Sequence, residues 1–188
     1  MDRQEALEIV KEKLKPKRYE HTIRVMDTAV SLAKYYGVNE KKIELAAILH
    51  DYAKYRSPDE MRRWVIKEKL PQDILEYNDE LLHGPVGSKM IEHELGVKDG
   101  LIQNAIYYHT TGKRNMTLFE KIIFIADYIE PGRQFPGVEA VREVVYKDIH
   151  EACYMAATNT ILFLMEMEQP IYPDTFQLYN ERYIKGGK

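Results

Sequence analysis

Four residues far apart in the chain have the types and the order of a divalent-metal site: His21, the adjacent pair His50 and Asp51, and Asp127. Imidazole and carboxylate ligands together suit iron, manganese or zinc. A bound metal of this kind lowers the pKa of its water and supplies hydroxide at neutral pH. The pattern therefore indicates a metal-dependent hydrolase.

The segments that carry two of the histidines have helical spacing. The residues leading to His50 fall at i, i+3, i+4 and i+7, on one helix face: Ile43, Ala46, Ala47 and His50. The residues leading to His109 repeat this spacing: Ile102, Ala105, Ile106 and His109. Because both histidines end an apolar stripe, we expect their side chains to point toward the interior.

Asp127 and His21 also belong to segments that we expect to be helical and inward-facing. Asp127 lies in IIFIADYI, an almost wholly apolar run. Burying a lone carboxylate is costly, so it must be paired, hydrogen-bonded or bound to a metal. His21 begins a helix with an apolar inward face: Val25, Met26, Ala29, Val30 and Ala33. Polar ligands from different helices are therefore expected to meet in one core.

Helix signals dominate the chain, and alternating strand patterns are scarce. We expect helices over about 2–14, 19–36, 39–50, 84–95, 138–149 and 150–167, and a short helix in the tail 169–180. Three more are expected: one that begins at 57–58, one that ends at 109 and one that contains 127 and ends at 131. Residues 71–83 and 110–115 are expected to be loops. The sequence thus predicts an all-α, single-domain helical bundle over residues 1–188, with its core at roughly 17–135.

Composition narrows the class of protein. The length of 188 residues suits one domain. A net charge of -3 gives no electrostatic footprint for nucleic acid, although a small anionic ligand needs only a local basic pocket. The single cysteine, Cys153, excludes an internal disulfide framework, fits a reducing compartment and is expected to pack in the core. The N-terminus lacks a signal-peptide h-region, and no apolar run approaches the ~20 residues that cross a membrane, so we expect a cytoplasmic protein.

Six segments in this order carry a resemblance to a known family: HTIRV at 21–25, HDYAK at 50–54, HGPVG at 83–87, YHTTG at 108–112, ADYIEPGR at 126–133 and IYPDT at 171–175. Together they resemble the HD superfamily of metal-dependent phosphohydrolases, and within it the YqeK-like branch. A lone His-Asp dipeptide is weak evidence, but this ordered set spans nearly the whole chain. No ligand position departs from the pattern.

The resemblance implies an HD-type helical bundle that hydrolyses diadenosine tetraphosphate (Ap4A) symmetrically to two ADP. It also implies that His21, His50, Asp51 and Asp127 are the metal ligands, with iron favoured and manganese, cobalt or zinc as alternatives. Two further histidines match positions near the metal: His83 and His109. They either bind a second metal bridged by Asp51 or contact the substrate phosphates, and the sequence leaves both roles open.

For catalysis we expect hydroxide on the metal to attack one β-phosphorus in line, with ADP as the leaving group. Lys54 follows the His-Asp pair by one helical turn and would neutralise phosphate charge. Arg133 follows a Pro-Gly helix stop, which frees it to fork around a phosphate. His109, or His83 if it binds no metal, would donate a proton to the leaving oxygen.

Further substrate contacts are expected from three places. Arg18 and Arg24 flank His21 at i−3 and i+3, although Arg24 could equally pair with Glu20. The turn at Thr110, Thr111 and Gly112 offers hydroxyl and backbone N–H groups to phosphate oxygens. The candidate segment for ribose and base is the rigid, aromatic stretch Pro170, Ile171, Tyr172, Pro173, Asp174 and Thr175, with Tyr172 the first choice.

Other functions compete with this interpretation. A nucleoside monophosphatase or a cyclic-nucleotide phosphodiesterase would use the same metal site, and a slow nucleotide-binding sensor would keep it. A purely structural helical module is disfavoured because of the cost of so many inward polar groups. His93 and His150 have charged neighbours and are assigned no role. Aromatic residues on the last helices would permit a homodimer if they are exposed.

Overall fold

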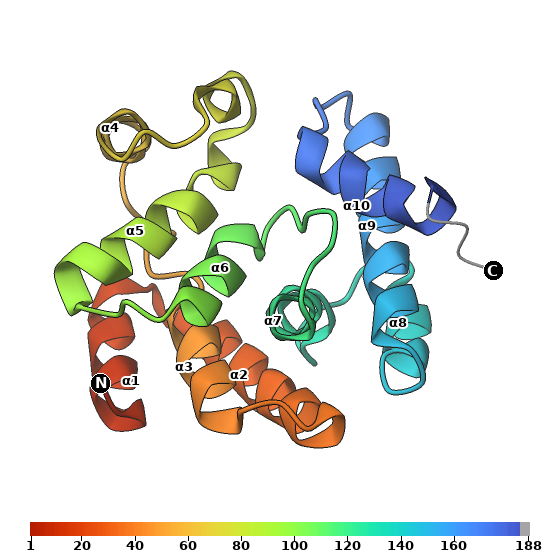
Figure 1. The fold of residues 1–188 in the computed structure, drawn as a ribbon, viewed down its shortest axis with the longest axis horizontal. Coiled ribbons are helices and arrows are strands. Elements are labelled where there is room, and N and C mark those ends of the chain that lie inside the picture. Colours follow the sequence, from red (N-terminus) through yellow and green to blue (C-terminus); the bar gives the residue numbers. More distant parts are fainter. Residues whose placement is uncertain (185–188) are drawn as a thin grey trace.

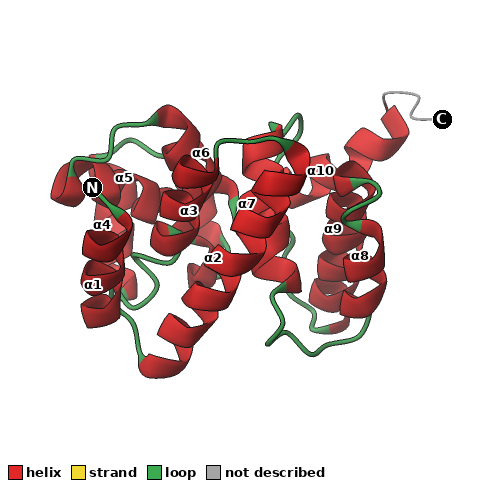
Figure 2. Ribbon diagram, turned by 90° about the horizontal axis from the view of Figure 1, so that it is seen from below, coloured by secondary structure: helices red, strands yellow, loops and turns green. Residues whose placement is uncertain are grey.

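A computed structural model describes residues 1–184, and within that range the chain forms helices and no strands (Figures 1 and 2). The all-α prediction is therefore confirmed. The α-helices are α1 Arg3–Lys13, α2 Pro16–Tyr36, α3 Glu40–Leu49, α4 Pro58–Lys67, α5 His83–Leu95, α6 Gly100–Tyr108, α7 Leu118–Ile129, α8 Val138–Val144, α9 Ile149–Glu166 and α10 Pro173–Ile184. Two short 3-10 helices, η1 Gln72–Glu76 and η2 Asp79–Leu81, lie between α4 and α5.

Local sequence explains where most of these helices begin. At five helices the N-cap side chain accepts a hydrogen bond from a first-turn backbone N–H group. These N-cap residues are Asp2, Asn39, Ser57, Asp99 and Asp148. Thr117 and Glu120 form a reciprocal capping box at α7. Gly37 ends α2 in the left-handed region, at φ 69°.

Some boundaries differ from the expected ones. Pro16 opens α2, since proline at the first helical position loses no hydrogen bond there. α5 begins at His83, so this histidine belongs to the first turn of a helix and not to the preceding loop. The tail forms the 12-residue helix α10, longer than expected, because Leu178 and Thr175 on it are buried.

Helix α7 lies at the centre of the molecule, where Figure 1 shows it almost end-on. It packs against α2 and α6 on one side and against α9 on the other, and α8 and α10 in turn pack against α9. One hydrophobic cluster runs from Ala6 in α1 to Leu178 in α10. Cys153 on α9 is fully buried in this cluster, as predicted.

Helices α5 and α6 approach each other closely at Gly84. A Cβ atom on this residue would lie only 2.8 Å from the backbone oxygen of Tyr107 in α6. A glycine is therefore needed for the two backbones to come this near. The close approach places His83, at the start of α5, beside His109, which follows the end of α6.

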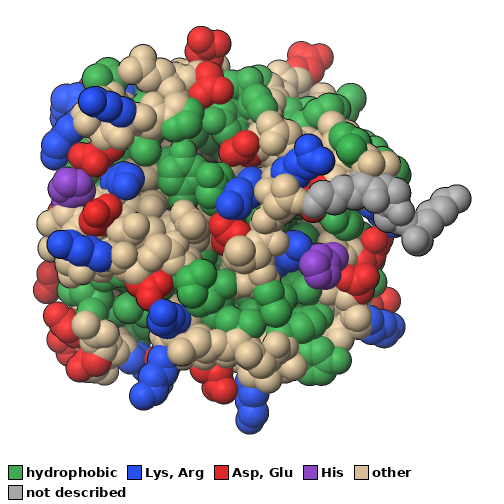
Figure 3. All heavy atoms as spheres, in the orientation of Figure 1, with side chains coloured by type: hydrophobic (Ala, Val, Ile, Leu, Met, Phe, Trp, Pro, Cys, Tyr) green, Lys and Arg blue, Asp and Glu red, His purple; other side chains and the backbone are tan. Residues whose placement is uncertain are grey.

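The surface agrees with the modest net charge. On the face shown in Figure 3, Lys and Arg side chains alternate with Asp and Glu, without one continuous basic patch among the described residues. None of the helices in residues 1–184 has the length and apolar character to span a membrane. The cytoplasmic location and the homodimer remain predictions.

Candidate metal and phosphate site

The four ligands predicted for the first metal meet between α2, α3 and α7. The Nε2 atom of His21 lies 2.9 Å from Oδ1 of Asp127, and Nε2 of His50 lies 3.2 Å from Oδ2 of Asp51. Ligand atoms of His21, His50 and Asp127 all lie within 4.8 Å of one another. His50 and Asp51 are fully buried, so this is a cluster of polar groups inside the core.

Three imidazoles are oriented by backbone carbonyls three residues earlier in the chain. The Nδ1 atom of His50 lies 2.6 Å from the oxygen of Ala47, and that of His109 lies 2.7 Å from the oxygen of Ile106. His83 makes the same contact with the carbonyl of Glu80. Because a carbonyl only accepts, each Nδ1 carries the proton and each Nε2 turns toward the cluster.

His21 is oriented differently, by a carboxylate on another element. Its Nδ1 lies 3.0 Å from Oε1 of Glu130, which is buried just after α7. Glu130 is itself held by Arg24, whose Nε donates to Oε2 at 2.6 Å, and by the backbone N–H of Gly132 at 2.6 Å. Although burial opposes ionisation, Arg24 and His21 keep the pKa of Glu130 below its ordinary value. Glu130 therefore accepts the proton of His21 Nδ1.

Several buried acceptor atoms in the cluster have no hydrogen-bond partner: His21 Nε2, His50 Nε2 and Asp51 Oδ1. The 2.9 Å contact between His21 Nε2 and Asp127 Oδ1 joins two acceptors when Nδ1 holds the imidazole proton. Such a contact is stable only with a cation, either a proton or a metal ion, at these atoms. The residues present therefore fit a divalent metal, the group that the donor set favours.

A second pair of acceptors faces Asp51 from the opposite side. The Nε2 atoms of His83 and His109 are 3.0 Å apart, and Oδ1 of Asp51 lies 3.2 Å from the first and 3.8 Å from the second. Oδ2 of Asp51 is instead the oxygen near His50 and His21. Asp51 thus presents one oxygen to each histidine pair, as a bridging carboxylate would.

The electrostatics of the cluster keep its two carboxyls and His109 in the forms that bind metals, whereas Asp51 raises the pKa of His50 although burial opposes this. Burial alone would raise the pKa of Asp51, but His50 and His83 hold that pKa well below its usual range. Burial likewise opposes ionisation of Asp127, yet His21 and Arg133 hold its pKa well below its usual range. Burial, reinforced by His83 and His50, lowers the pKa of His109 to about 3. Both carboxyls are therefore charged at neutral pH, and His109 is neutral.

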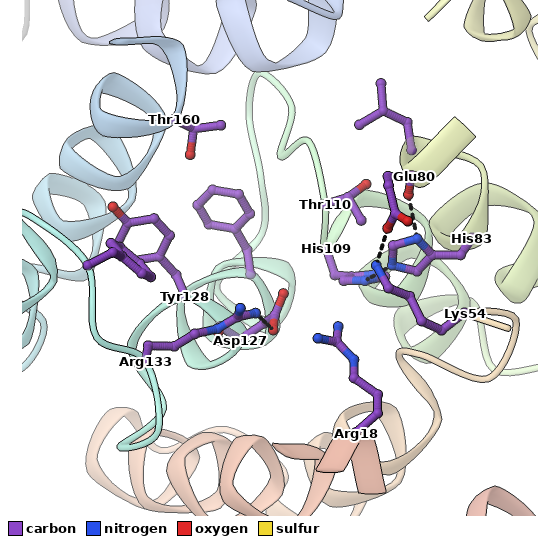
Figure 4. A pocket seen from close by; sticks show the side chains of 13 residues that line it. Arg18, Lys54, Glu80, His83, His109, Thr110, Asp127, Tyr128, Arg133 and Thr160 are labelled. Carbon is purple, nitrogen blue, oxygen red and sulfur yellow. Dashed lines mark hydrogen bonds and ion pairs between the residues drawn. The ribbon is translucent and has the colours of Figure 1, made fainter. Parts of the chain in front are cut away.

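A cavity of about 320 Å³ adjoins the cluster (Figure 4). Three predicted cations line it and already contact carboxylates there. Arg18 pairs with Asp51, Arg133 donates from Nη2 to Oδ1 of Asp127 at 2.7 Å, and Lys54 pairs with Glu80 at 2.5 Å. Thr110 lines the cavity too, and its buried hydroxyl has no hydrogen-bond partner. His83, His109 and Asp127 complete the predicted residues on its wall.

The structure places other predicted substrate contacts away from this cavity. Arg24 donates a hydrogen bond to Glu130 and not to Glu20. It does not line the cavity. Thr111 is buried, with its hydroxyl donating to the carbonyl of Gly112 and its own carbonyl accepting from Thr175 at 2.9 Å. Both threonines therefore tie α10 to the loop after α6.

The segment from Pro170 to Thr175 is also absent from the cavity wall. Tyr172 is only 8% exposed and packs edge-to-face on Tyr77, with ring centres 5.0 Å apart. Burial, together with Asp73, raises the pKa of its hydroxyl. The aromatic character that indicated a base-binding segment instead serves the packing of α10 against the region around η1.

Sequence reasoning missed several residues of the site. Glu130 lies three residues after Asp127, so helical spacing places the two on one face, and this signal could have identified it. Glu80 precedes His83 by three residues in the same way. The remaining wall of the cavity carried no such signal: Leu81, Phe124, Tyr128, Phe135 and Thr160.

Comparison with known proteins agrees with this geometry. The model of the HD domain matches residues 18–132, which contain all six candidate ligands. The chain belongs to the HD domain family. A crystal structure of a predicted HD superfamily hydrolase involved in NAD metabolism, from Clostridium acetobutylicum, superposes with a TM-score of 0.90 at 37% identity, covering 95% of each chain. The HD-type helical fold is thus shared over nearly the whole length.

Two relatives are both named symmetrical bis(5'-nucleosyl)-tetraphosphatase. The protein from Halalkalibacterium halodurans is 55% identical over 98% of this chain and 99% of its own. The protein from Bacillus subtilis is 49% identical over 96% of this chain and 97% of its own. A third relative, from Mycoplasma genitalium, is named a probable nicotinate-nucleotide adenylyltransferase/Ap4A hydrolase and is 32% identical over 63% of this chain and 33% of its own.

Proposed function

We propose that this HD-family chain is a symmetrical bis(5'-nucleosyl)-tetraphosphatase, which hydrolyses Ap4A to two ADP. The relatives named for this activity align with the chain from end to end, which supports the assignment. The observation that carries it is the cluster of buried acceptors beside a cavity with three cations, since it joins a metal site to a polyphosphate site. One water is consumed, and the bond broken joins one β-phosphorus to the oxygen that bridges the two central phosphates.

Two metals are the arrangement that the geometry supports best. His21, His50, Asp51 and Asp127 would hold the first, and His83, His109 and the other oxygen of Asp51 would help to hold the second. We propose iron, with manganese, cobalt or zinc as alternatives, because this imidazole and carboxylate set suits all four. When bound, the metal supplies Lewis-acid stabilisation of phosphoryl charge and activates water.

The three cations would bind the polyphosphate. Arg18, Lys54 and Arg133 reach the cavity from α2, the turn after α3 and the loop after α7, so they surround it from different sides (Figure 4). Each could exchange its carboxylate for a phosphate oxygen, and guanidinium groups do so in a forked geometry. The hydroxyl of Thr110 would donate to another phosphate oxygen. Lys54 would neutralise charge on the departing ADP.

His83 and His109 fit a ligand role better than a proton-donor role. In each, Nδ1 donates its proton to a backbone carbonyl. The other ring nitrogen, Nε2, faces the cavity side and carries a lone pair. A lone pair can bind a metal or accept a proton, but it has no proton to give to the leaving oxygen. This geometry favours the first of the two alternatives left open by the sequence.

A product assay tests the proposal. The protein loaded with ferrous iron or manganese is given Ap4A, and the products are separated by ion exchange. We expect ADP alone, with the rate falling about 10³-fold in Asp51→Ala, because the loss of roughly 4 kcal/mol of metal-derived stabilisation has that effect. Asp27→Ala, an exposed aspartate of α2, is the matched control and should keep full activity.

The same assay also reports the position of cleavage. AMP together with ATP would contradict symmetrical cleavage while keeping a hydrolase. Absence of turnover with each metal would contradict the enzyme and favour the nucleotide-binding sensor.

A further inference from the structure

A second cavity, of about 470 Å³, adjoins the one described above. The two cavities share three wall residues: Tyr128, Phe135 and Thr160. The rest of the second wall comes from the loop before α8 and from α9: Pro136, Asn159, Leu162, Phe163 and Glu166. The two cavities are therefore neighbouring compartments that share these three wall residues.

The two compartments differ in charge. Three cations, Arg18, Lys54 and Arg133, outnumber two carboxylates, Glu80 and Asp127, on the wall of the first. The second has no Lys or Arg on the wall that the structure describes and carries one carboxylate, Glu166. A polyphosphate is attracted to the first and repelled from the second. A molecule with a charged middle and uncharged ends would therefore place its phosphates in the first compartment and an end group in the second.

The lining of the second compartment suits a flat aromatic group. Phe135 stands edge-to-face against Tyr128, with ring centres 5.0 Å apart. Phe163 is 58% exposed and Leu162 is 59% exposed on α9, so their apolar surface is open to a ligand. Base stacking on such side chains is favourable and tolerates different bases.

Polar groups sit where a nucleoside would need them. The side-chain amide of Asn159 donates to the hydroxyl oxygen of Tyr128 at 3.1 Å, which fixes the amide beside the aromatic wall. Its oxygen is an acceptor of the kind that an exocyclic amine of a base requires. The hydroxyl of Thr160 donates to the carbonyl of Ala156 at 2.9 Å and lies on the boundary of the two compartments, where a ribose would link base to phosphate.

We infer that the second compartment binds one nucleoside end of the dinucleotide substrate, with the base against Phe163 and Phe135 and the ribose near Thr160. This inference rests on the proposed function, which supplies the dinucleotide. It assigns the base to α9 and the loop before α8, and not to the 170–175 segment, which is packed in the fold.

Binding of two probes tests the inference without requiring turnover. ADP and inorganic pyrophosphate are titrated by calorimetry into the metal-loaded protein and into Phe163→Ala. We expect the variant to bind ADP about tenfold more weakly, the loss of one stacking contact, and to bind pyrophosphate unchanged. Phe176→Ala removes a phenyl ring of similar exposure from α10, outside both compartments, and should change neither affinity. With Ap4A, the Phe163→Ala defect should appear mainly in KM.

The outcomes separate this inference from the proposed function. Unchanged ADP affinity in Phe163→Ala, or equal losses for ADP and pyrophosphate, would overturn the nucleoside site. A shift from dimer to monomer in sedimentation, with ADP binding intact, would also overturn it, because a second copy would then cover these side chains. Selective loss of ADP binding in a protein that does not cleave Ap4A would support the site while refuting the tetraphosphatase.

Discussion

The site contains two kinds of histidine, and they differ in what holds them. His50, His83 and His109 each donate to a backbone carbonyl only three residues earlier in the chain. His21 donates to Glu130, 109 residues later in the chain. The first three are thus oriented by local structure, and the fourth by a tertiary contact.

Helix geometry explains the difference. The last carbonyls of a helix have no backbone partner within it, so His50 after α3 and His109 after α6 each find a free acceptor one turn back. His83 begins α5 and uses the carbonyl of Glu80 in the short helix η2. His21 lies inside α2, where the carbonyls one turn back are used by the helix itself. Its Nδ1 must find an acceptor on another element, and a buried, charged Glu130 provides one. The His21 side of the site is therefore the side that depends most on distant residues.

The largest expected effect is on metal content and activity, and it distinguishes the His21 part of the site from the His83 part. His21→Ala should lose the first metal and about 10³-fold in Ap4A hydrolysis, since several kcal/mol of Lewis-acid stabilisation are lost. His83→Ala should keep the first metal and lose the second. Metal analysis after dialysis, in parallel with the activity assay, measures both. Equal metal content in His83→Ala and the unmodified chain would contradict a dinuclear site and return His83 to a phosphate contact.

A smaller effect is expected from Glu130→Gln, which tests how His21 is oriented. The neutral amide keeps the size of the side chain but weakens the interactions with His21 and Arg24. Loss of such an orienting group typically costs about 10–100-fold in metal affinity or activity. Glu20→Gln, an exposed glutamate of α2, is the matched control. Unchanged metal affinity in Glu130→Gln would show that α2 alone orients His21.

The smallest effect, on stability, is expected at the α5 and α6 contact. In Gly84→Ala the added methyl group meets a backbone oxygen at 2.8 Å, so the helices must separate. Overpacking of this kind costs about 1–3 kcal/mol of unfolding free energy. Gly100→Ala, where a Cβ atom meets nothing within 4 Å, is the control. Chemical denaturation measures both variants, and equal stability would mean that the α5 start can shift without loss.

Much of the site could be predicted from residue type and order. The four first-metal ligands, the two further histidines, Arg18, Lys54, Thr110 and Arg133 all lie where the cluster and the first cavity meet. Their positions follow from periodic apolar faces, which fix the side of each helix that is buried. The roles of these residues remain proposals until they are measured.

The residues that the structure places away from the cavity were those whose sequence pattern had two physical interpretations. Arg24 had a helical spacing that suited either a substrate contact or an ion pair, and it pairs with Glu130, the buried carboxylate that follows α7. Tyr172 and its neighbours had the aromatic and proline content of a ligand-binding segment, which is also that of a packed one. The sequence around Phe135 and Phe163 gave no signal of a binding site. Phe135 lies in a loop and Phe163 on an exposed helix face, and they line one cavity only because the fold brings these segments together.

The sequence by itself determined the all-α class, the buried faces of most helices, the inward direction of His50 and His109 and the set of candidate ligands. These features depend on interactions between residues close in sequence, so they do not require the tertiary structure to be known. Only the tertiary structure decided that Glu130 supports His21, that each oxygen of Asp51 faces a different histidine pair and that a charged compartment adjoins an apolar one. Those features depend on distances between helices remote in sequence, and side-chain packing around α7 sets those distances.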